Sequence, residues 1–133
     1  MAETLEFELV SPAKLLISEP VEMVVVPGAE GDFGALPQHA PMLSTVRPGV
    51  IDVYKNDKVA ERIFVAGGFA EVTQERCTVL AEEAVPLSDL NRDDVEARLQ
   101  AAKDALQEAD DPLEKTQAQA RLVVAQAMMA ALA

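Results

Sequence analysis

The 133-residue sequence lacks most of the side chains that build metal sites, disulfide frameworks and aromatic binding surfaces. It has one cysteine, Cys77, one histidine, His39, and no tryptophan, and only 4% of its residues are aromatic. One cysteine excludes an internal disulfide, and one histidine excludes a multi-histidine metal site. Cys77 lies in an alternating apolar run, so we interpret it as a buried strand residue and not as a reactive thiol. We expect neither a metal nor another cofactor.

Basic residues and long apolar runs are also scarce. The 11 lysines and arginines face 23 aspartates and glutamates, which gives a formal net charge of −12. This charge opposes the approach of phosphate backbones and anionic lipids, so we expect no nucleic-acid partner. No run of about 18 apolar residues is present, and Met1–Glu6 lacks the basic and then apolar pattern of a signal peptide. We therefore expect a soluble, cytosolic protein.

The sequence from Leu5 to Pro86 has the pattern of an all-β domain. Short alternating or apolar runs are separated by Gly, Pro, Asn and Asp, as in a β-sandwich or barrel. Because the runs follow one another so closely, the strands should be mostly antiparallel. The runs that predict strands are 5–10, 21–26, 50–54, 59–65, 69–72 and 77–81.

The sequence after Pro86 has the pattern of two helices. It contains no glycine, one proline and many alanines, which are strong helix formers. Asn91 is the expected N-cap of the first helix, and Asp111 that of the second, with Pro112 at N1 and Glu114 at N3 in capping-box register. The sequence thus divides into a β domain, residues 1–86, and an antiparallel helical hairpin, residues 87–133.

Small side chains dominate the apolar faces of this hairpin. The stripe expected on the first helix is Val95, Leu99, Ala102, Leu106 and Ala109, and that on the second is Leu113, Gln117, Ala120, Val124, Ala127 and Ala131. Each methylene that alanine lacks relative to leucine forgoes about 0.8 kcal/mol of burial. We therefore expect a mobile appendage that is held only weakly to the β domain.

The glycine-rich segment 28–34 and His39 are the features that could suggest chemistry. The segment has no Lys-Ser/Thr ending, and Glu30 and Asp32 would repel phosphate, so it is not a phosphate-binding loop. We interpret its glycines as positive-φ residues of an exposed connection. His39, with Asp32 and Ser44 nearby in sequence, leaves a hydrolytic triad open as an alternative to a histidine that bonds its own loop or a partner.

Several motifs in order along the chain carry a specific resemblance. Residues 27–44, Pro-Gly-Ala-Glu-Gly-Asp-Phe-Gly-Ala-Leu-Pro-Gln-His-Ala-Pro-Met-Leu-Ser, resemble the signature loop of the epsilon subunit of F-type ATP synthases, of the bacterial type and the counterpart of the mitochondrial delta subunit. Arg47–Val50 and Gly67–Val72 resemble the next two motifs of that family. Ser11 after the first strand and the alanine-rich tail from about Asp89 are similar as well.

The resemblance implies a ten-stranded antiparallel β-sandwich followed by an antiparallel helical hairpin. It also implies a non-catalytic rotor subunit that binds the gamma subunit, rests on the ring of c subunits and couples proton flow to ATP synthesis. By the resemblance the ring contact falls on Glu30, Gly31, Asp32 and His39, with Ser11 as a further position. Membrane association would come only through the complex, at the cytoplasmic face of a bacterial inner membrane.

The hairpin departs from what the family can do. In some members it extends into the catalytic alpha/beta head and blocks ATP hydrolysis, and in some it binds ATP. Here residues 87–133 contain 5 Lys and Arg against 9 Asp and Glu, a net of −4, which should weaken insertion between acidic surfaces. Asp94 and Arg98 are four residues apart where the nucleotide motif has three, and Leu99 replaces its alanine. We therefore expect little inhibition and no ATP binding.

Two other classes of function remain as alternatives. A free-standing β-sandwich could bind a soluble ligand, although the few aromatic side chains argue against a sugar-stacking surface. A hydrolase using His39 is the second alternative. A stable complex with the gamma subunit would separate the rotor interpretation from both.

Overall fold

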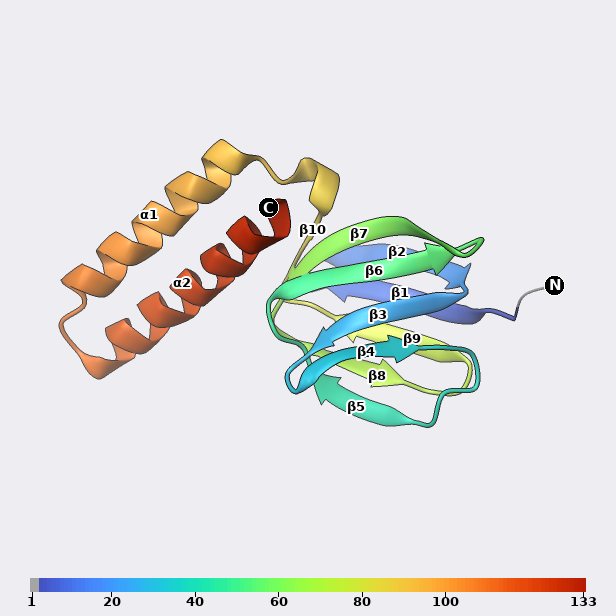
Figure 1. Cartoon of the computed structure of the whole chain (residues 1–133). Helices are drawn as coiled ribbons and strands as arrows, with labels where there is room; N and C mark the ends of the chain where they lie inside the picture. The colour runs from blue at the N-terminus through green and yellow to red at the C-terminus, as the bar shows by residue number, and fades with distance from the viewer. Residues whose placement is uncertain (1–2) are drawn as a thin grey trace. The chain divides into compact units, whose positions relative to one another are not determined.

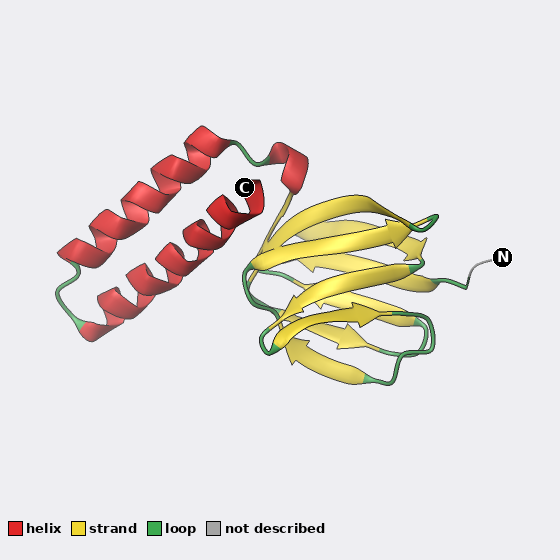
Figure 2. Ribbon diagram, in the orientation of Figure 1, coloured by secondary structure: helices red, strands yellow, loops and turns green. Residues whose placement is uncertain are grey.

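The computed structural model describes residues 3–133 and contains two compact units, one up to Pro86 and one from Leu87 to Ala133. The first unit consists of ten strands in two five-stranded sheets, and the second of two helices (Figure 1 and Figure 2).

The first sheet has the strand order β2-β1-β9-β8-β5, and the second β10-β7-β6-β3-β4. The strands of the first sheet are β1 (Leu5–Ser11), β2 (Lys14–Val21), β5 (Met42–Thr45), β8 (Phe69–Val72) and β9 (Arg76–Leu80). Those of the second are β3 (Met23–Gly28), β4 (Gly31–Ala35), β6 (Gly49–Lys55), β7 (Lys58–Ala66) and β10 (Glu83–Pro86). The antiparallel sandwich is confirmed with one exception, because β1 and β9 pair in parallel, with Phe7 opposite Cys77.

The strands that periodicity missed are the four edge strands. The predicted runs correspond to the inner strands β1, β3, β6, β7, β8 and β9, whereas β2, β10, β4 and β5 lie at the sheet edges. An edge strand has one free side and is less strictly patterned, as the mostly exposed or half-buried residues of β5 and β10 illustrate. The run 21–26 was also placed too early, since Val21 ends β2 and β3 begins at Met23.

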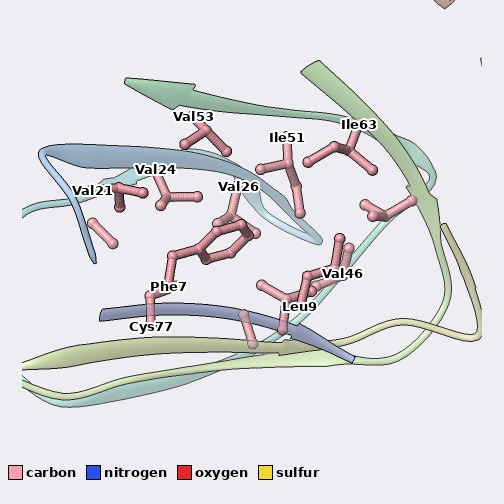
Figure 3. Close-up of a cluster of buried hydrophobic side chains, with 14 of the residues drawn as sticks. Phe7, Leu9, Val21, Val24, Val26, Val46, Ile51, Val53, Ile63 and Cys77 are labelled. Carbon is pink, nitrogen blue, oxygen red and sulfur yellow. The ribbon is translucent and has the colours of Figure 1, made fainter. Parts of the chain in front are cut away.

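The core lies between the two sheets and is built from branched and aromatic side chains (Figure 3). Phe7 and Leu9 come from the first sheet, and Val24, Val26 and Ile51 from the second; all five are at most 1% exposed. Such alternation of inward and outward residues is what lets two sheets pack face to face.

Cys77 belongs to this core. It is fully buried, and burial raises the pKa of its thiol to about 12. The interpretation of this residue as an inert strand position is confirmed, because a thiol that stays protonated is a poor nucleophile.

The second unit contains a short 3-10 turn (Leu87–Asp89) and the helices α1 (Arg92–Glu108) and α2 (Pro112–Leu132). Both predicted N-caps are confirmed. The Asn91 side chain accepts a hydrogen bond from the amide of Asp94 at 3.2 Å, and Asp111 accepts one from that of Glu114 at 2.8 Å. The Glu114 carboxylate accepts from the amide of Asp110 at 3.0 Å, one residue before the position that a capping box requires.

The apolar face predicted for α1 is confirmed. That predicted for α2 is only partly right, because Val124, Ala127 and Ala131 are half-buried but the other three predicted residues are exposed. On α1, Val95 and Ala102 are buried and Leu99, Leu106 and Ala109 half-buried. On α2, Leu113 is 66% exposed and Gln117 and Ala120 are exposed, whereas the buried residues are Ala118, Ala125 and Met128. Alanines surround this helix on every side, so the pattern has too little contrast to select a face.

Candidate partner-binding site

The turn 28–32, at which β3 passes into β4, begins the signature loop. Gly28 pairs with Gly31 across it. A Cβ on Gly28 would lie 2.8 Å from the Gly31 carbonyl oxygen and 3.1 Å from the Phe33 ring, so a larger residue does not fit. Of the three glycines of segment 28–34, Gly31 has a positive φ, 136°, and Gly34 lies inside strand β4. The segment is therefore a tight hairpin, and the expectation of a glycine-lined exposed connection was only partly right.

Arg47 holds this turn from the side. One guanidinium nitrogen, Nη1, donates to the Gly28 carbonyl at 2.5 Å, and the other, Nη2, donates to the Asp32 carboxylate at 2.5 Å. The Arg47 amide donates to the Pro27 carbonyl at 2.9 Å, and the Ala29 amide donates to the Thr45 carbonyl at 2.9 Å. The turn is thus bonded to the end of β5 and to Arg47 just after it.

Ser11 lies at the same end of the sandwich as this turn. The Val46 amide, next to Arg47, donates to the Gly68 carbonyl at 3.1 Å, and the chain around Gly68 is pressed against Leu80. Leu80 in turn pairs with Val10, the residue before Ser11. The structure therefore brings four of the predicted site residues to one end of the sandwich: Ser11, Glu30, Gly31 and Asp32.

His39 lies at the other end. Strand β4 carries the chain from Gly31 to Ala35, across the sandwich, before the loop that holds His39 begins. There the Gln38 amide donates to the Gln74 carbonyl at 2.7 Å, next to the turn between β8 and β9. The His39 Nδ1 atom lies 2.6 Å from the Ala40 carbonyl oxygen, a contact within its own loop. His39 is thus separated from the rest of the predicted ring contact.

The arrangement contradicts the hydrolytic triad. The Asp32 carboxylate is bonded to Arg47, the Ser44 hydroxyl donates to the Thr45 carbonyl at 2.9 Å, and the His39 ring contacts Ala40. The three side chains do not contact one another, and a nucleophile must lie within hydrogen-bond reach of its base. Within residues 3–133, moreover, no three His, Cys, Asp or Glu side chains are placed to hold a metal ion.

An apolar row on the outer face of the first sheet was missed by the sequence reasoning. The register places Leu15, Val10, Leu80 and Phe69 side by side on the adjacent strands β2, β1, β9 and β8. Leu15 is 55% exposed, Phe69 43% and Leu80 38%, and Leu43 on β5, 68% exposed, extends the row. We call these five residues the outer apolar row.

A pocket of about 400 Å³ joins the outer apolar row to the end of the sandwich where the turn lies, and its lining includes Ser11, Pro12, Gly68 and Phe69. A contiguous exposed apolar surface of this kind marks an interaction site more often than a free surface. The signal available in the sequence was that Val10, Leu80 and Phe69 occupy the outward positions of their strands.

Comparison with known proteins identifies the family. Residues 4–87 match the family model described as ATP synthase, Delta/Epsilon chain, beta-sandwich domain. An ATP synthase epsilon chain from Rhodospirillum rubrum is 65% identical over 131 residues, 98% of each chain, and one from Paramagnetospirillum magneticum is 61% identical over 133 residues, all of each chain. The chain belongs to the ATP synthase epsilon family.

A solved structure agrees with this assignment. A chain in the cryo-EM structure of the Euglena gracilis mitochondrial ATP synthase, OSCP/F1/c-ring, has a TM-score of 0.83 and 25% identity, with 98% of this chain and 82% of that chain covered. The epsilon subunit is a non-catalytic part of the central stalk. As an epsilon subunit, the chain serves ATP synthesis through contacts with other subunits and not through a reaction of its own. None of the helices within residues 3–133 is long and apolar enough to cross a membrane.

Proposed function

We propose that this epsilon subunit couples the proton-driven c-ring to the gamma subunit through two surfaces of its β-sandwich. The turn 28–32 and Ser11 contact the ring, and the outer apolar row contacts gamma. The observation that carries the proposal is the convergence of Ser11, Glu30, Gly31 and Asp32 at one end of a rigid sandwich, next to an exposed apolar surface. Transfer of torque needs a contact that does not yield, and a turn bonded at both ends meets that need.

The apolar row suits a permanent partner. Exposed leucine and phenylalanine side chains gain burial when a second subunit covers them, at about 25 cal/mol per Å² of apolar area. The ring-facing turn is instead charged and carries Glu30 and Asp32. Because the ring, gamma and the epsilon subunit turn together as one rotor, the contrast between the surfaces lies in their chemistry: the apolar row needs a partner that keeps it covered, and we assign it to gamma, while the charged turn is left for the ring.

His39 is not part of the proposed ring contact, because it lies at the opposite end of the sandwich from the turn 28–32. The helical hairpin, with its net charge of −4, contacts the catalytic alpha/beta head only weakly and suppresses hydrolysis little. The subunit acts at the cytoplasmic face of a bacterial inner membrane and associates with the membrane only through the complex.

Cross-linking tests the ring contact. A Glu30→Cys variant, assembled in the complete synthase, should form a disulfide with a cysteine in the ring loop that faces the stalk. The matched control is Asp57→Cys, in the β6–β7 turn at the opposite end of the sandwich, which should form none. Cys77 needs no replacement because it is fully buried. Equal cross-linking from positions 30 and 57 would contradict the proposed orientation.

Binding tests the gamma contact separately. Leu80→Asp or Phe69→Asp should abolish co-elution with gamma on size exclusion, because a carboxylate would be buried in an apolar interface. The matched control is Val59→Asp, which changes another exposed apolar residue, 42% exposed, on β7 of the second sheet. If Val59→Asp weakens binding as much as the other two variants, the outer apolar row is not the gamma surface.

A further inference from the structure

The two carboxylates of the turn are in different situations. Asp32 forms an ion pair with Arg47. Glu30 is exposed, and it makes no hydrogen bond or ion pair with any residue in the described range 3–133. The two acidic residues look alike in sequence but differ in the structure. The Asp32 carboxylate is bonded within the chain, whereas the Glu30 carboxylate is left for another molecule.

Arg47 makes three hydrogen bonds to the turn, two to residues at its start and one to a residue at its end. Its amide reaches Pro27 and its Nη1 reaches the Gly28 carbonyl before the turn, while its Nη2 reaches Asp32 after it. A guanidinium is planar and presents its donors in a fixed fork, so the two acceptors are held at a fixed separation. A lysine at the same position offers a single ammonium group and no such fork.

Global stability does not account for this arrangement. The Arg47 side chain is 43% exposed and that of Asp32 60%, and ion pairs so exposed to solvent contribute little to folding. The backbone next to Arg47 is in contrast tightly packed, because a Cβ on Gly49 would lie 2.9 Å from the Pro27 Cβ. The Arg47 side chain thus extends from a firmly held backbone to an exposed turn.

We propose that Arg47 is a positioning residue, which fixes the turn 28–32 so that Glu30 meets the partner in one orientation. Asp32 serves as an internal anchor for Arg47, and Glu30 is the carboxylate that the ring contacts. This inference rests on the proposed ring contact and adds to it a division of roles between the two acids. It also identifies Arg47, fifteen positions after Asp32, as a residue that shapes the contact without touching the ring.

Amide hydrogen exchange in the free full-length chain tests the positioning without the ring. The reporter is the Ala29 amide, which bonds the Thr45 carbonyl, and the internal control is the Ala81 amide, which bonds the Val10 carbonyl at the same end of the sandwich. Arg47→Ala should speed exchange at Ala29 by about fivefold or more and leave Ala81 unchanged, because only local opening is affected.

Three further variants sharpen this test. Arg47→Lys keeps a cation that can donate to only one of the two acceptors, and Asp32→Asn keeps the acceptor oxygen but loses the ion pair. Both variants should give intermediate rates at the Ala29 amide. Arg62→Ala is the matched control, since Arg62 forms a comparable exposed ion pair with Asp52, 2.9 Å, between β7 and β6. Equal exchange at Ala29 in Arg47→Ala and Arg62→Ala would overturn the proposal.

Cross-link selectivity in the assembled synthase tests the functional half. With Glu30→Cys and cysteines placed one at a time at successive positions of the ring loop, the chain with Arg47 should favour one position several-fold. Arg47→Ala should spread the cross-links over neighbouring positions, and Arg47→Lys should restore part of the selectivity. Unchanged selectivity in Arg47→Ala would overturn the positioning role even if exchange at Ala29 were faster.

The two kinds of failure are distinguishable. If Glu30→Cys cross-links to no ring position while Arg47 is present, the proposed ring contact is wrong and this inference falls with it. The exchange data would then still report on the local bonds of Arg47, because that measurement does not involve the ring. Variants that melt near the wild-type temperature are the ones compared, and Arg47→Lys and Asp32→Asn serve if Arg47→Ala does not fold.

Discussion

The sandwich and the helical hairpin bury different side chains and are specified in different ways. The sandwich buries Phe7 and Ile51, which are 44 positions apart in sequence, so its core depends on long-range strand pairing. The hairpin buries mainly alanines, and its helices begin at local side-chain caps. One chain thus contains a stiff block that can hold a contact surface and a second unit whose order is mostly local.

Removing a large core side chain from each unit should produce the largest difference. Phe7→Ala should cost about 3–5 kcal/mol of the free energy of unfolding of the sandwich, because a fully buried ring leaves a cavity. Met128→Ala should cost the hairpin about 2 kcal/mol. Denaturant unfolding followed by residue-resolved NMR measures both, and a larger loss from Met128→Ala would break the comparison.

A single methyl group at Gly68 should cost the sandwich about 2–4 kcal/mol. Its φ is 92°, and a Cβ there would lie 1.7 Å from the Leu80 carbonyl oxygen, so strain and overpacking combine. The matched control is Gly34→Ala, whose Cβ would first meet the Met23 sulfur at 3.4 Å and whose effect should stay within about 0.5 kcal/mol. Thermal melting of the two variants decides, and equal melting temperatures would contradict the prediction.

Loss of a helix cap should affect the hairpin alone, by about 1 kcal/mol for each cap. Asn91→Ala and Asp111→Ala leave the amides of Asp94 and Glu114 without their side-chain acceptors. Amide exchange should become faster in α1 and α2, respectively, and remain unchanged in the core strands β1 and β6. Faster exchange in those strands would show that the sandwich depends on the hairpin more than the comparison allows.

The smallest expected effect is a pH dependence at the edge of the sandwich. Partial burial and a hydrogen bond with Glu19 raise the pKa of Glu61 above its ordinary value of 4.5. The folded chain therefore holds this proton more tightly than the unfolded chain, and the associated stability is lost as the pH rises through the raised pKa. Glu61→Gln cannot lose this proton, so the free energy of unfolding of the variant should rise slightly relative to that of the wild type as the pH increases from 4 to 7.

The opposite shift of Glu19 does not change this sign. The largest cause of the lowered pKa of Glu19 is a hydrogen bond with Lys55, whose Nζ lies 2.8 Å from the carboxylate. Glu61→Gln leaves this hydrogen bond in place. Urea unfolding of both chains at four pH values in this range gives the difference. An advantage of Glu61→Gln that grows as the pH falls would contradict the prediction.

The sequence was sufficient for the inner strands and the helix starts, because alternation and caps are local signals. The four edge strands were missed since an edge strand needs no strict alternation. The face predicted for α2 was wrong in the first half of the helix, because Ala118 and Ala120 look equivalent in a pattern made of alanine. Such failures follow from weak contrast in the sequence.

The site was predictable only in part. The turn 28–32 and its acidic residues were evident, but the bond between Asp32 and Arg47 joins residues that only the folded sandwich brings together. His39 lies seven positions after Asp32, and strand β4 carries the chain across the sandwich in between. Asp32 and His39 are thus close in sequence but lie at opposite ends of the sandwich, and a sequence motif alone does not show this.

The most direct test of the account replaces the subunit in the assembled synthase with a chain that ends at Pro86. The sandwich should still bind gamma and the ring, so proton-driven ATP synthesis should persist, and the rate of ATP hydrolysis should change only slightly. Loss of ATP synthesis, or a several-fold rise in hydrolysis, would contradict the claim that the sandwich carries the coupling and that the hairpin contributes little to it.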